Sequence, residues 1–253
     1  MKNKLKVLDL FSGIGGFSLG LENTDYYETV AFCEIEKFQQ QVLKKNWPKV
    51  PIYSDIKELS YERLKADGIN TIDVVTGGYP CQPFSIAGKQ KGEQDPRHLW
   101  PEMFRIIKEC RPSWVIGENV SGHIKFGLDT VLDNLESEGY SARTFNISAS
   151  SIGAWHKRER VWIVASNSNS ERKYSRNASK KGTTNARELQ GGKRRNTRTM
   201  EVWDVEPKLG RVAHGIPNKP HRIRALGNSV VPQIPQLIGI SIIEVVQSFN
   251  NTE

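Results

Sequence analysis

The sequence has little cysteine. Its 253 residues include three cysteines, Cys33, Cys81 and Cys110, which lie far apart and show no paired spacing. An odd number without paired spacing argues against both a disulfide framework and a cysteine zinc site. The first residues also lack the apolar stretch of a secretory signal. We therefore expect no export, a reduced cytoplasmic setting and no bound metal.

Long apolar runs are scarce as well, and residues 230–249 form the one segment of nearly membrane-spanning length. This segment contains Pro232, Pro235 and Glu244, which a lipid-facing helix tolerates poorly. We predict instead a C-terminal helix that starts near Pro235 and docks on a core, with no membrane partner. The side chains expected to face that core are Leu237, Ile238, Ser241, Ile242 and Val245.

Charge is distributed unevenly along the chain. Lys and Arg number 36 against 28 Asp and Glu, a net charge of +8 that favours a polyanionic partner. Residues 167–200 hold ten basic and two acidic residues, so this window accounts for the whole excess. Because it is poor in apolar residues, we expect it to be flexible in isolation. It is either a solvated basic loop or an arm that contacts phosphates.

Short apolar runs alternate with amphipathic helical patterns over the first 165 residues. Runs at residues 5–11, 29–33, 73–76, 114–116 and 161–165 contain the β-branched residues typical of buried strands. The pattern predicts an α/β domain with a doubly wound, mostly parallel sheet. The length of the chain favours one large domain, alone or with a small appendage.

A glycine turn follows the first predicted strand. Gly13, Gly15 and Gly16 would let a ligand approach backbone amides at a helix N-terminus, although a tight turn alone has the same appearance. Glu34 ends the second predicted strand, where a carboxylate can accept both hydroxyls of a ribose. Asp55 would similarly accept from an adenine amino group. Together these residues indicate a nucleoside-containing cofactor.

The sharpest local signal is the loop at residues 77–85 (GGYPCQPFS), which follows the third main strand. It places the thiol of Cys81 at the carboxyl end of a strand, where open α/β sheets bind ligands. Glu118 follows the next strand at the same edge, and partial burial would raise its pKa into a proton-donating range. Cys33 and Cys110 lie in apolar periodic segments typical of buried, inert thiols. Arg158 and Arg160 precede the last strand and, taken alone, are typical of an exposed charged turn.

Together these elements resemble the DNA cytosine-5 methyltransferases. Residues 9–17 (DLFSGIGGF) are similar to the cofactor loop of that family, and residues 79–85 (YPCQPFS) to its nucleophile loop. Residues 118–120 (ENV), 158–160 (RER) and 227–233 (GNSVVPQ) resemble its proton-donor, arginine and C-terminal motifs. The motifs occur in the order of the family. His156 stands where family members often have glutamine, a change that leaves both arginines in place.

The resemblance implies a Rossmann-like, S-adenosylmethionine-dependent methyltransferase fold and a covalent mechanism. Cys81 would attack carbon 6 of cytosine, and Glu118 would protonate or hydrogen-bond ring nitrogen 3. Arg158 would contact the carbonyl oxygen of the base, with Arg160 in support near the nucleophile loop. Carbon 5 would take a methyl group from S-adenosylmethionine, leaving S-adenosylhomocysteine. The target base would have to be flipped out of the duplex.

The resemblance also assigns binding residues. The cofactor residues would be Phe11, Gly13, Ile14, Gly15, Gly16, Glu34, Asp55, Ile56, Pro80, Leu99, Asn228 and Val230. The residues expected to contact DNA are Gln82 and Ser85 in the nucleophile loop and Arg172, Lys173, Arg176, Lys180, Lys181, Arg194 and Arg195 in the basic segment.

The predicted organisation has three parts. Residues 1–165 would form the catalytic and cofactor-binding domain, 166–224 a small target-recognition region with the basic arm, and 225–253 a segment that returns to the catalytic domain. The recognition region is short and poor in apolar residues, which indicates relaxed recognition, a very short site or a required partner. The expected partners are double-stranded DNA and a cognate restriction endonuclease, and the expected state is a monomer of restriction-modification or phage-borne type.

Two alternatives stay open from the sequence. The same mechanism would serve an RNA cytosine, and a degenerate methyltransferase fold would serve a non-catalytic DNA-binding protein. The presence of Cys81, Glu118, Arg158 and Asn228 argues against the second alternative, because degeneration would affect these residues first.

Overall fold

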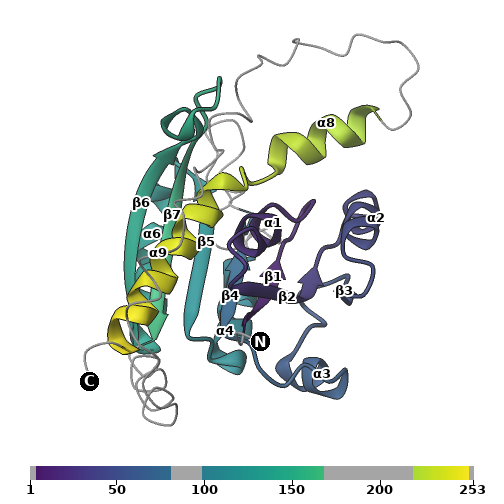
Figure 1. Cartoon of the computed structure of the whole chain (residues 1–253), viewed down its shortest axis with the longest axis vertical. Coiled ribbons are helices and arrows are strands. Elements are labelled where there is room, and N and C mark those ends of the chain that lie inside the picture. Colours follow the sequence, from purple (N-terminus) through teal and green to yellow (C-terminus); the bar gives the residue numbers. More distant parts are fainter. Residues whose placement is uncertain (1–3, 81–98, 168–218, 251–253) are drawn as a thin grey trace, which may run out of the picture.

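A seven-stranded mixed sheet forms the centre of the molecule (Figure 1). The computed structural model describes residues 4–80, 99–167 and 219–250. The strand order is β3-β2-β1-β4-β5-β7-β6, and β7 runs antiparallel to both of its neighbours. The strands are β1 (Leu5–Leu10), β2 (Tyr27–Cys33), β3 (Ile52–Tyr53), β4 (Val74–Gly77), β5 (Trp114–Val120), β6 (Tyr140–Ser148) and β7 (Glu159–Asn167). The predicted doubly wound, mostly parallel α/β fold is confirmed.

Helices cover both faces of the sheet (Figure 1). One face packs against α4 (Trp100–Cys110) and α6 (Leu128–Ser137), and the other against α1 (Gly16–Glu22) and α9 (Gln233–Asn250). A hydrophobic core lies on each face of the sheet, and alternate residues of β1 point into one or the other. Val7 lies in the core on the α1 side and Leu8 in the core on the α4 side. The remaining elements are α2 (Lys37–Asn46), α3 (Tyr61–Ala66), α5 (His123–Phe126), α8 (Lys219–Asn228) and the 3₁₀ helix η2 (Ala149–Ile152).

The structure corrects the sequence-based strands near the site. The polar residue Glu118 lies within β5 instead of after it, and Arg160 lies within β7 instead of before it. The cause is the antiparallel ladder between these strands, which pairs Val120 with Arg160 and extends both strands through polar residues. β6 was not predicted, because most of its side chains are exposed or only half-buried and its apolar pattern is weak.

The C-terminal helix docks as predicted, on a face that overlaps the expected one in part. The predicted core residue Ile242 is buried and the predicted Ile238 is half-buried against the same core, which Ile234 and Val246 also enter. The predicted core residues Leu237 and Val245 are exposed. A close contact sets the orientation. The Tyr27 hydroxyl donates to the Gly239 carbonyl at 2.8 Å, and a Cβ on Gly239 would lie 2.8 Å from Leu21. The residues that face the sheet are therefore those in line with Gly239, including Pro235, Ile242 and Val246.

The stretch Arg224–Ser248 has the length and apolar composition of a membrane span, and 28% of its tested window is buried. Core helices of soluble proteins pass the same test, so this similarity is weak evidence. In the described structure, α9 lies along the sheet with one face in the core (Figure 1).

The contact between α1 and the C-terminal segment generates a stability prediction. A Cβ on Gly20 would lie 2.1 Å from the Pro232 carbonyl oxygen, a backbone atom that has little room to move. We expect Gly20→Ala to lower the free energy of unfolding by about 1–3 kcal/mol, measured by urea denaturation. Gly122→Ala is the matched control, because a Cβ there would meet nothing within 4 Å. Equal stability of the two variants would contradict the predicted close packing.

Candidate functional site

The turn after β1 is shaped by backbone conformations that favour glycine. Gly13 and Gly15 have φ values of 56° and 87°, and Phe11 adopts 52° despite its side chain. A Cβ on Gly15 would lie 2.6 Å from the Trp47 ring, and a Cβ on Gly16 would lie 2.7 Å from the Val230 carbonyl oxygen. Among the described residues, a Cβ on Gly13 would meet nothing within 4 Å, so this part of the structure leaves one side of the turn open. The turn leads into the N-terminus of α1.

Glu34 closes one side of this turn. It directly follows β2, is 8% exposed, and accepts hydrogen bonds from the backbone amides of Gly13 (2.7 Å) and Glu36 (2.9 Å). Burial raises its pKa, while these amides act in the opposite direction. The predicted nearness of the second-strand carboxylate to the glycine turn is therefore present. Its predicted contact with a ribose stays a prediction.

An exposed apolar residue beside this carboxylate was missed by the sequence analysis. Ile35 is 68% exposed although it sits between the buried Glu34 and the start of α2. Its position directly after the acidic residue was the signal available in the sequence. An apolar side chain at this edge would cover the flat face of a nucleobase.

The other predicted cofactor residues lie on different elements. Asp55 accepts from the backbone amide of Lys57 at 2.9 Å, and the Ile56 side chain is buried while its carbonyl accepts from Arg105. Pro80 is exposed after β4, Leu99 precedes α4, and Asn228 ends α8. Val230 packs against the turn at Gly16, so the C-terminal segment does return to the glycine turn.

An ion pair links the neighbouring strands β5 and β7. Glu118 on β5 forms an ion pair with Arg160 on β7, with 3.0 Å between Oε1 and Nε and side chains only 12% and 21% exposed. The other carboxylate oxygen would lie 3.3 Å from a Cβ on Gly78, three residues before Cys81. Burial raises the pKa of Glu118, and the charges of Arg160 and Arg158 lower it. A buried acid therefore faces the start of the predicted nucleophile loop.

Arg158 makes different contacts from Arg160. Its guanidinium donates to the carbonyls of Gly227 (2.6 Å) and Ser229 (3.0 Å), which ties the C-terminal segment to the start of β7. Burial lowers the pKa of Arg158, and the neighbouring charge of Arg160 lowers it further. In this structure Arg160, on the strand, is the arginine that forms the ion pair with Glu118. The base contact assigned to Arg158 stays a prediction.

Several predicted residues lie outside the described residues. These are Cys81, Gln82 and Ser85 in the nucleophile loop and Arg172, Lys173, Arg176, Lys180, Lys181, Arg194 and Arg195 in the basic segment. The two cysteines that the structure does describe, Cys33 and Cys110, are buried, and burial raises their pKa to about 12. Their prediction as inert thiols agrees with that environment.

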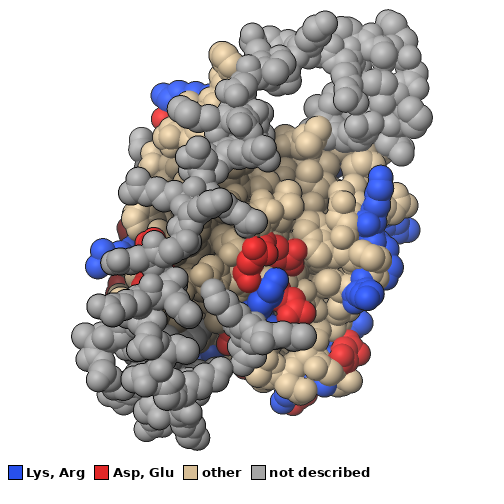
Figure 2. Space-filling model, in the orientation of Figure 1, with Lys and Arg blue, Asp and Glu red and all other residues tan. Residues whose placement is uncertain are grey.

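The described part of the chain holds no group of three or more His, Cys, Asp or Glu side chains suited to a metal ion. On the face seen in Figure 2, most of the surface is uncharged, and Lys and Arg gather along the side that carries α2 in Figure 1.

The arrangement defines a class of protein. The strand order, the glycine turn after β1, the carboxylate after β2 and the acid–arginine pair beside the loop after β4 are the features of a methyltransferase fold. Comparison with known proteins identifies the family. The model of the C-5 cytosine-specific DNA methylase family matches residues 5–211, and this chain belongs to that family.

Curated relatives include two type II methyltransferases. The chain is 35% identical over 167 residues to M.HgiCII of Herpetosiphon aurantiacus, covering 64% of this chain and 37% of the relative. It is 38% identical over 177 residues to M1.ScrFI of Lactococcus lactis subsp. cremoris, covering 68% and 44%. The matched part therefore spans less than half the length of these relatives.

Solved structures show the same architecture. The DNMT2 structure from Spodoptera frugiperda superposes with a TM-score of 0.56 at 26% identity, covering 66% of this chain and 51% of that one. The Dnmt2 methyltransferase of S. pombe superposes with a TM-score of 0.55 at 21% identity, covering 83% and 59%. The second likeness concerns the fold alone.

A buried carboxyl group that the sequence analysis missed generates a pH prediction. Asp9 on β1 is fully buried and accepts from the hydroxyls of Ser18 and Thr76, both at 2.8 Å, which links β1 to α1 and β4. Burial raises its pKa from 3.8 to about 7, against the effect of these hydroxyls. Protonated Asp9 therefore makes its full contribution to the free energy of unfolding below about pH 4. That contribution is lost as the pH rises through about 7.

We expect the free energy of unfolding of the wild type to fall between pH 4 and pH 8 more steeply than that of Asp9→Asn. The difference between the two slopes, integrated over this range, should reach roughly 4 kcal/mol, the value of a shift of about three pKa units. Urea denaturation at a series of pH values measures it. Parallel pH profiles would show that Asp9 titrates normally.

Proposed function

We propose that this chain methylates carbon 5 of cytosine in double-stranded DNA, with S-adenosylmethionine as the methyl donor. The observation that carries the proposal is the largely buried Glu118–Arg160 pair, which lies against Gly78, three residues before Cys81 in the sequence. An acid and a thiol are the two groups that addition to a cytosine ring requires. Family membership and the type II methyltransferase relatives support the same reaction.

The residues around the glycine turn fit the cofactor. The open side of Gly13 would admit the ligand beside backbone amides, and Glu34 at its edge would accept the ribose hydroxyls. Ile35 would cover the adenine, with Asp55 accepting from its amino group. The remaining turn residues and Phe11, Ile14, Ile56, Pro80, Leu99, Asn228 and Val230 would line the rest of the site. When bound, S-adenosylmethionine supplies the methyl group and leaves as S-adenosylhomocysteine.

The residues of the chain would perform the covalent steps on the base. The Cys81 thiolate adds to carbon 6 while Glu118 gives a proton or a hydrogen bond to ring nitrogen 3, which makes carbon 5 nucleophilic. After methylation, solvent takes the proton from carbon 5, and the electron pair of that bond re-forms the ring double bond and expels the Cys81 thiolate. Any proton given to ring nitrogen 3 returns to Glu118. Arg160 holds Glu118 in place, and Arg158 acts beside it at the base or through the C-terminal segment.

The substrate and setting form a further part of the proposal. A flipped cytosine costs a few kcal/mol of lost stacking and pairing, which contacts from the basic segment would offset. The type II relatives favour a restriction-modification or phage-borne enzyme that acts in the cytoplasm as a monomer, with a cognate endonuclease as partner. Target recognition would rest on residues 166–224.

Base-resolution sequencing of 5-methylcytosine tests the proposal directly. The chain is expressed in a methylation-free bacterial host beside a Cys81→Ala strain. We expect methylation in one short sequence context and its complete loss in Cys81→Ala, because the thiol is required for the addition step. Purified Cys81→Ala should still bind S-adenosylhomocysteine with near wild-type affinity.

The other outcomes of this experiment separate the alternatives. Methylation in many contexts would support the chemistry with weak target reading. Methylated RNA with unmethylated DNA would show that the substrate is RNA. Soluble, cofactor-binding protein that methylates neither would favour a non-catalytic DNA-binding role. Methylation that persists in Cys81→Ala would overturn the assigned nucleophile.

The cofactor site generates its own prediction. Glu34→Gln should weaken binding of S-adenosylhomocysteine about 10- to 100-fold, because it removes a charged acceptor of hydrogen bonds from both the Gly13 amide and the ligand. Isothermal titration calorimetry measures the affinity. Glu36→Gln is the matched control, since it keeps the backbone amide that donates to Glu34 and changes a side chain whose ion pair with Arg224 lies at the surface. Equal affinities for the two variants would remove Glu34 from the site.

A further inference from the structure

A buried hydrogen bond joins the residues that follow β4 to the residues that follow β5. The Tyr79 hydroxyl and the His123 Nε2 atom form a hydrogen bond of 2.9 Å whose direction depends on the imidazole tautomer. Both side chains are almost fully buried, at 3% and 2% exposed. Tyr79 lies two residues before Cys81, and His123 lies five residues after Glu118 at the start of α5.

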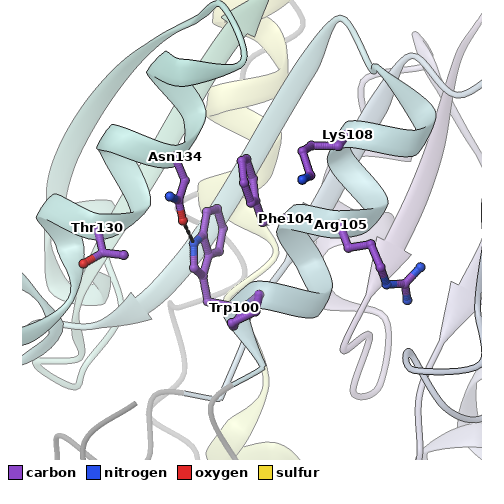
Figure 3. Close-up of a pocket in the computed structure, with 7 residues that line it drawn as sticks. Trp100, Phe104, Arg105, Lys108, Thr130 and Asn134 are labelled. Carbon is purple, nitrogen blue, oxygen red and sulfur yellow. Dashed lines mark hydrogen bonds between the residues drawn. The ribbon is translucent and has the colours of Figure 1, made fainter. Parts of the chain in front are cut away.

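Tyr79 is fixed at three points by three different elements. Its hydroxyl meets His123, its carbonyl accepts from the Asn119 side chain at 3.1 Å, and its ring lies 5.1 Å from the Trp100 ring. Trp100 is fixed in turn, because its indole N–H donates to Asn134 at 2.9 Å and joins α4 to α6 (Figure 3). The position of the backbone just before Cys81 is therefore strongly determined.

His123 is fixed from the opposite side by Gly127. A Cβ on Gly127 would lie 2.6 Å from the His123 ring carbon Cε1, so the imidazole sits directly against the glycine. The φ of Gly127 is −163°, which lies outside the left-handed region that favours glycine. Glycine is thus required there for the space that the imidazole occupies and not for the backbone.

Packing alone does not account for this pair. A phenylalanine and a leucine would fill similar volumes without bringing a hydroxyl and an imidazole into the core, where polar groups destabilise the fold unless they are hydrogen-bonded. A hydrogen bond adds direction and distance to the contact, which apolar packing does not. The pair therefore specifies where the Tyr79 end of the loop lies relative to β5, the strand that bears Glu118.

We propose that His123 is a positioning residue of this active site, which acts through Tyr79 to set the start of the Cys81 loop against Glu118. The inference rests on the proposed function, since its catalytic readout is cytosine methylation. The contacts it concerns, those of Gly78, Tyr79, Asn119 and His123, are all between described residues.

Three substitutions measure the effect on catalysis. His123→Leu removes the imidazole that hydrogen-bonds the buried Tyr79 hydroxyl, and we expect kcat for methylation to fall about 10- to 100-fold while KM for S-adenosylmethionine stays within about twofold. His123→Gln, whose amide can still hydrogen-bond the hydroxyl, should restore most of kcat. Adding Tyr79→Phe to His123→Leu removes both partners and should be less damaging than His123→Leu alone.

A matched pair of glycine variants tests the same position without changing either partner. Gly127→Ala should displace the imidazole and reduce kcat, whereas Gly122→Ala, on the other side of His123, meets nothing within 4 Å and should have no effect. Thermal denaturation of each variant shows whether it is folded at the assay temperature. A drop in kcat with the folded fraction unchanged is the signature of positioning.

Hydrogen–deuterium exchange gives a readout that does not depend on a substrate. Backbone amides around Gly78–Tyr79 and Asn119–His123 should exchange several-fold faster in His123→Leu than in the wild type or in His123→Gln. Unchanged exchange and unchanged kcat in His123→Leu would overturn the inference. A wild type that methylates neither DNA nor RNA would overturn the proposed function, and the exchange data would still decide whether His123 fixes the loop.

Discussion

The antiparallel pairing of β7 with β5 determines where the functional side chains lie. If β7 ran parallel to β5, its first residues would lie at the opposite edge of the sheet from the ends of β1, β2 and β4. The observed ladder places Arg160 opposite Val120 and brings its guanidinium to Glu118, two residues along β5. One reversed strand thus delivers an arginine to the same sheet edge as the glycine turn and the Cys81 loop. The rest of the site is arranged around that pair.

The C-terminal segment packs against this edge so closely that α1 has glycines where it contacts the segment. Arg158, at the start of β7, donates to the carbonyls of Gly227 and Ser229, and the next residues pack onto α1 at Gly16 and Gly20. These contacts join the end of the sheet, the glycine turn and the final helix. The C-terminal segment therefore joins the glycine turn, near the N-terminal end of the described chain, to the strand that bears the acid–arginine pair.

The sequence predicted most of the fold because its strands are apolar and its chemistry falls at strand ends. The runs that became β1, β2, β4, β5 and β7 were identified, and the glycine turn, Glu34 and Glu118 do lie at one edge. β6 was missed because its surface-facing residues resemble a loop, and Asp9 was missed because a carboxylate inside an apolar run reveals nothing of its partners. The division of roles between Arg158 and Arg160 was also beyond the sequence. Arg158 and Arg160 are separated by one residue, and the sequence does not distinguish their roles. The β5–β7 pairing determines which of them contacts Glu118.

The pKa of Glu118 depends on how many arginine side chains form an ion pair with it. Burial raises the pKa of this carboxyl group and is the largest influence on it, and the two arginine charges oppose that effect. Only Arg160 makes a direct contact, because the guanidinium of Arg158 is held by backbone carbonyls of the C-terminal segment. A second direct ion pair would stabilise the ionised form further and oppose proton donation. By holding Arg158 away from a direct ion pair, the C-terminal segment therefore leaves burial as the larger influence, and the pKa of Glu118 stays above its ordinary value.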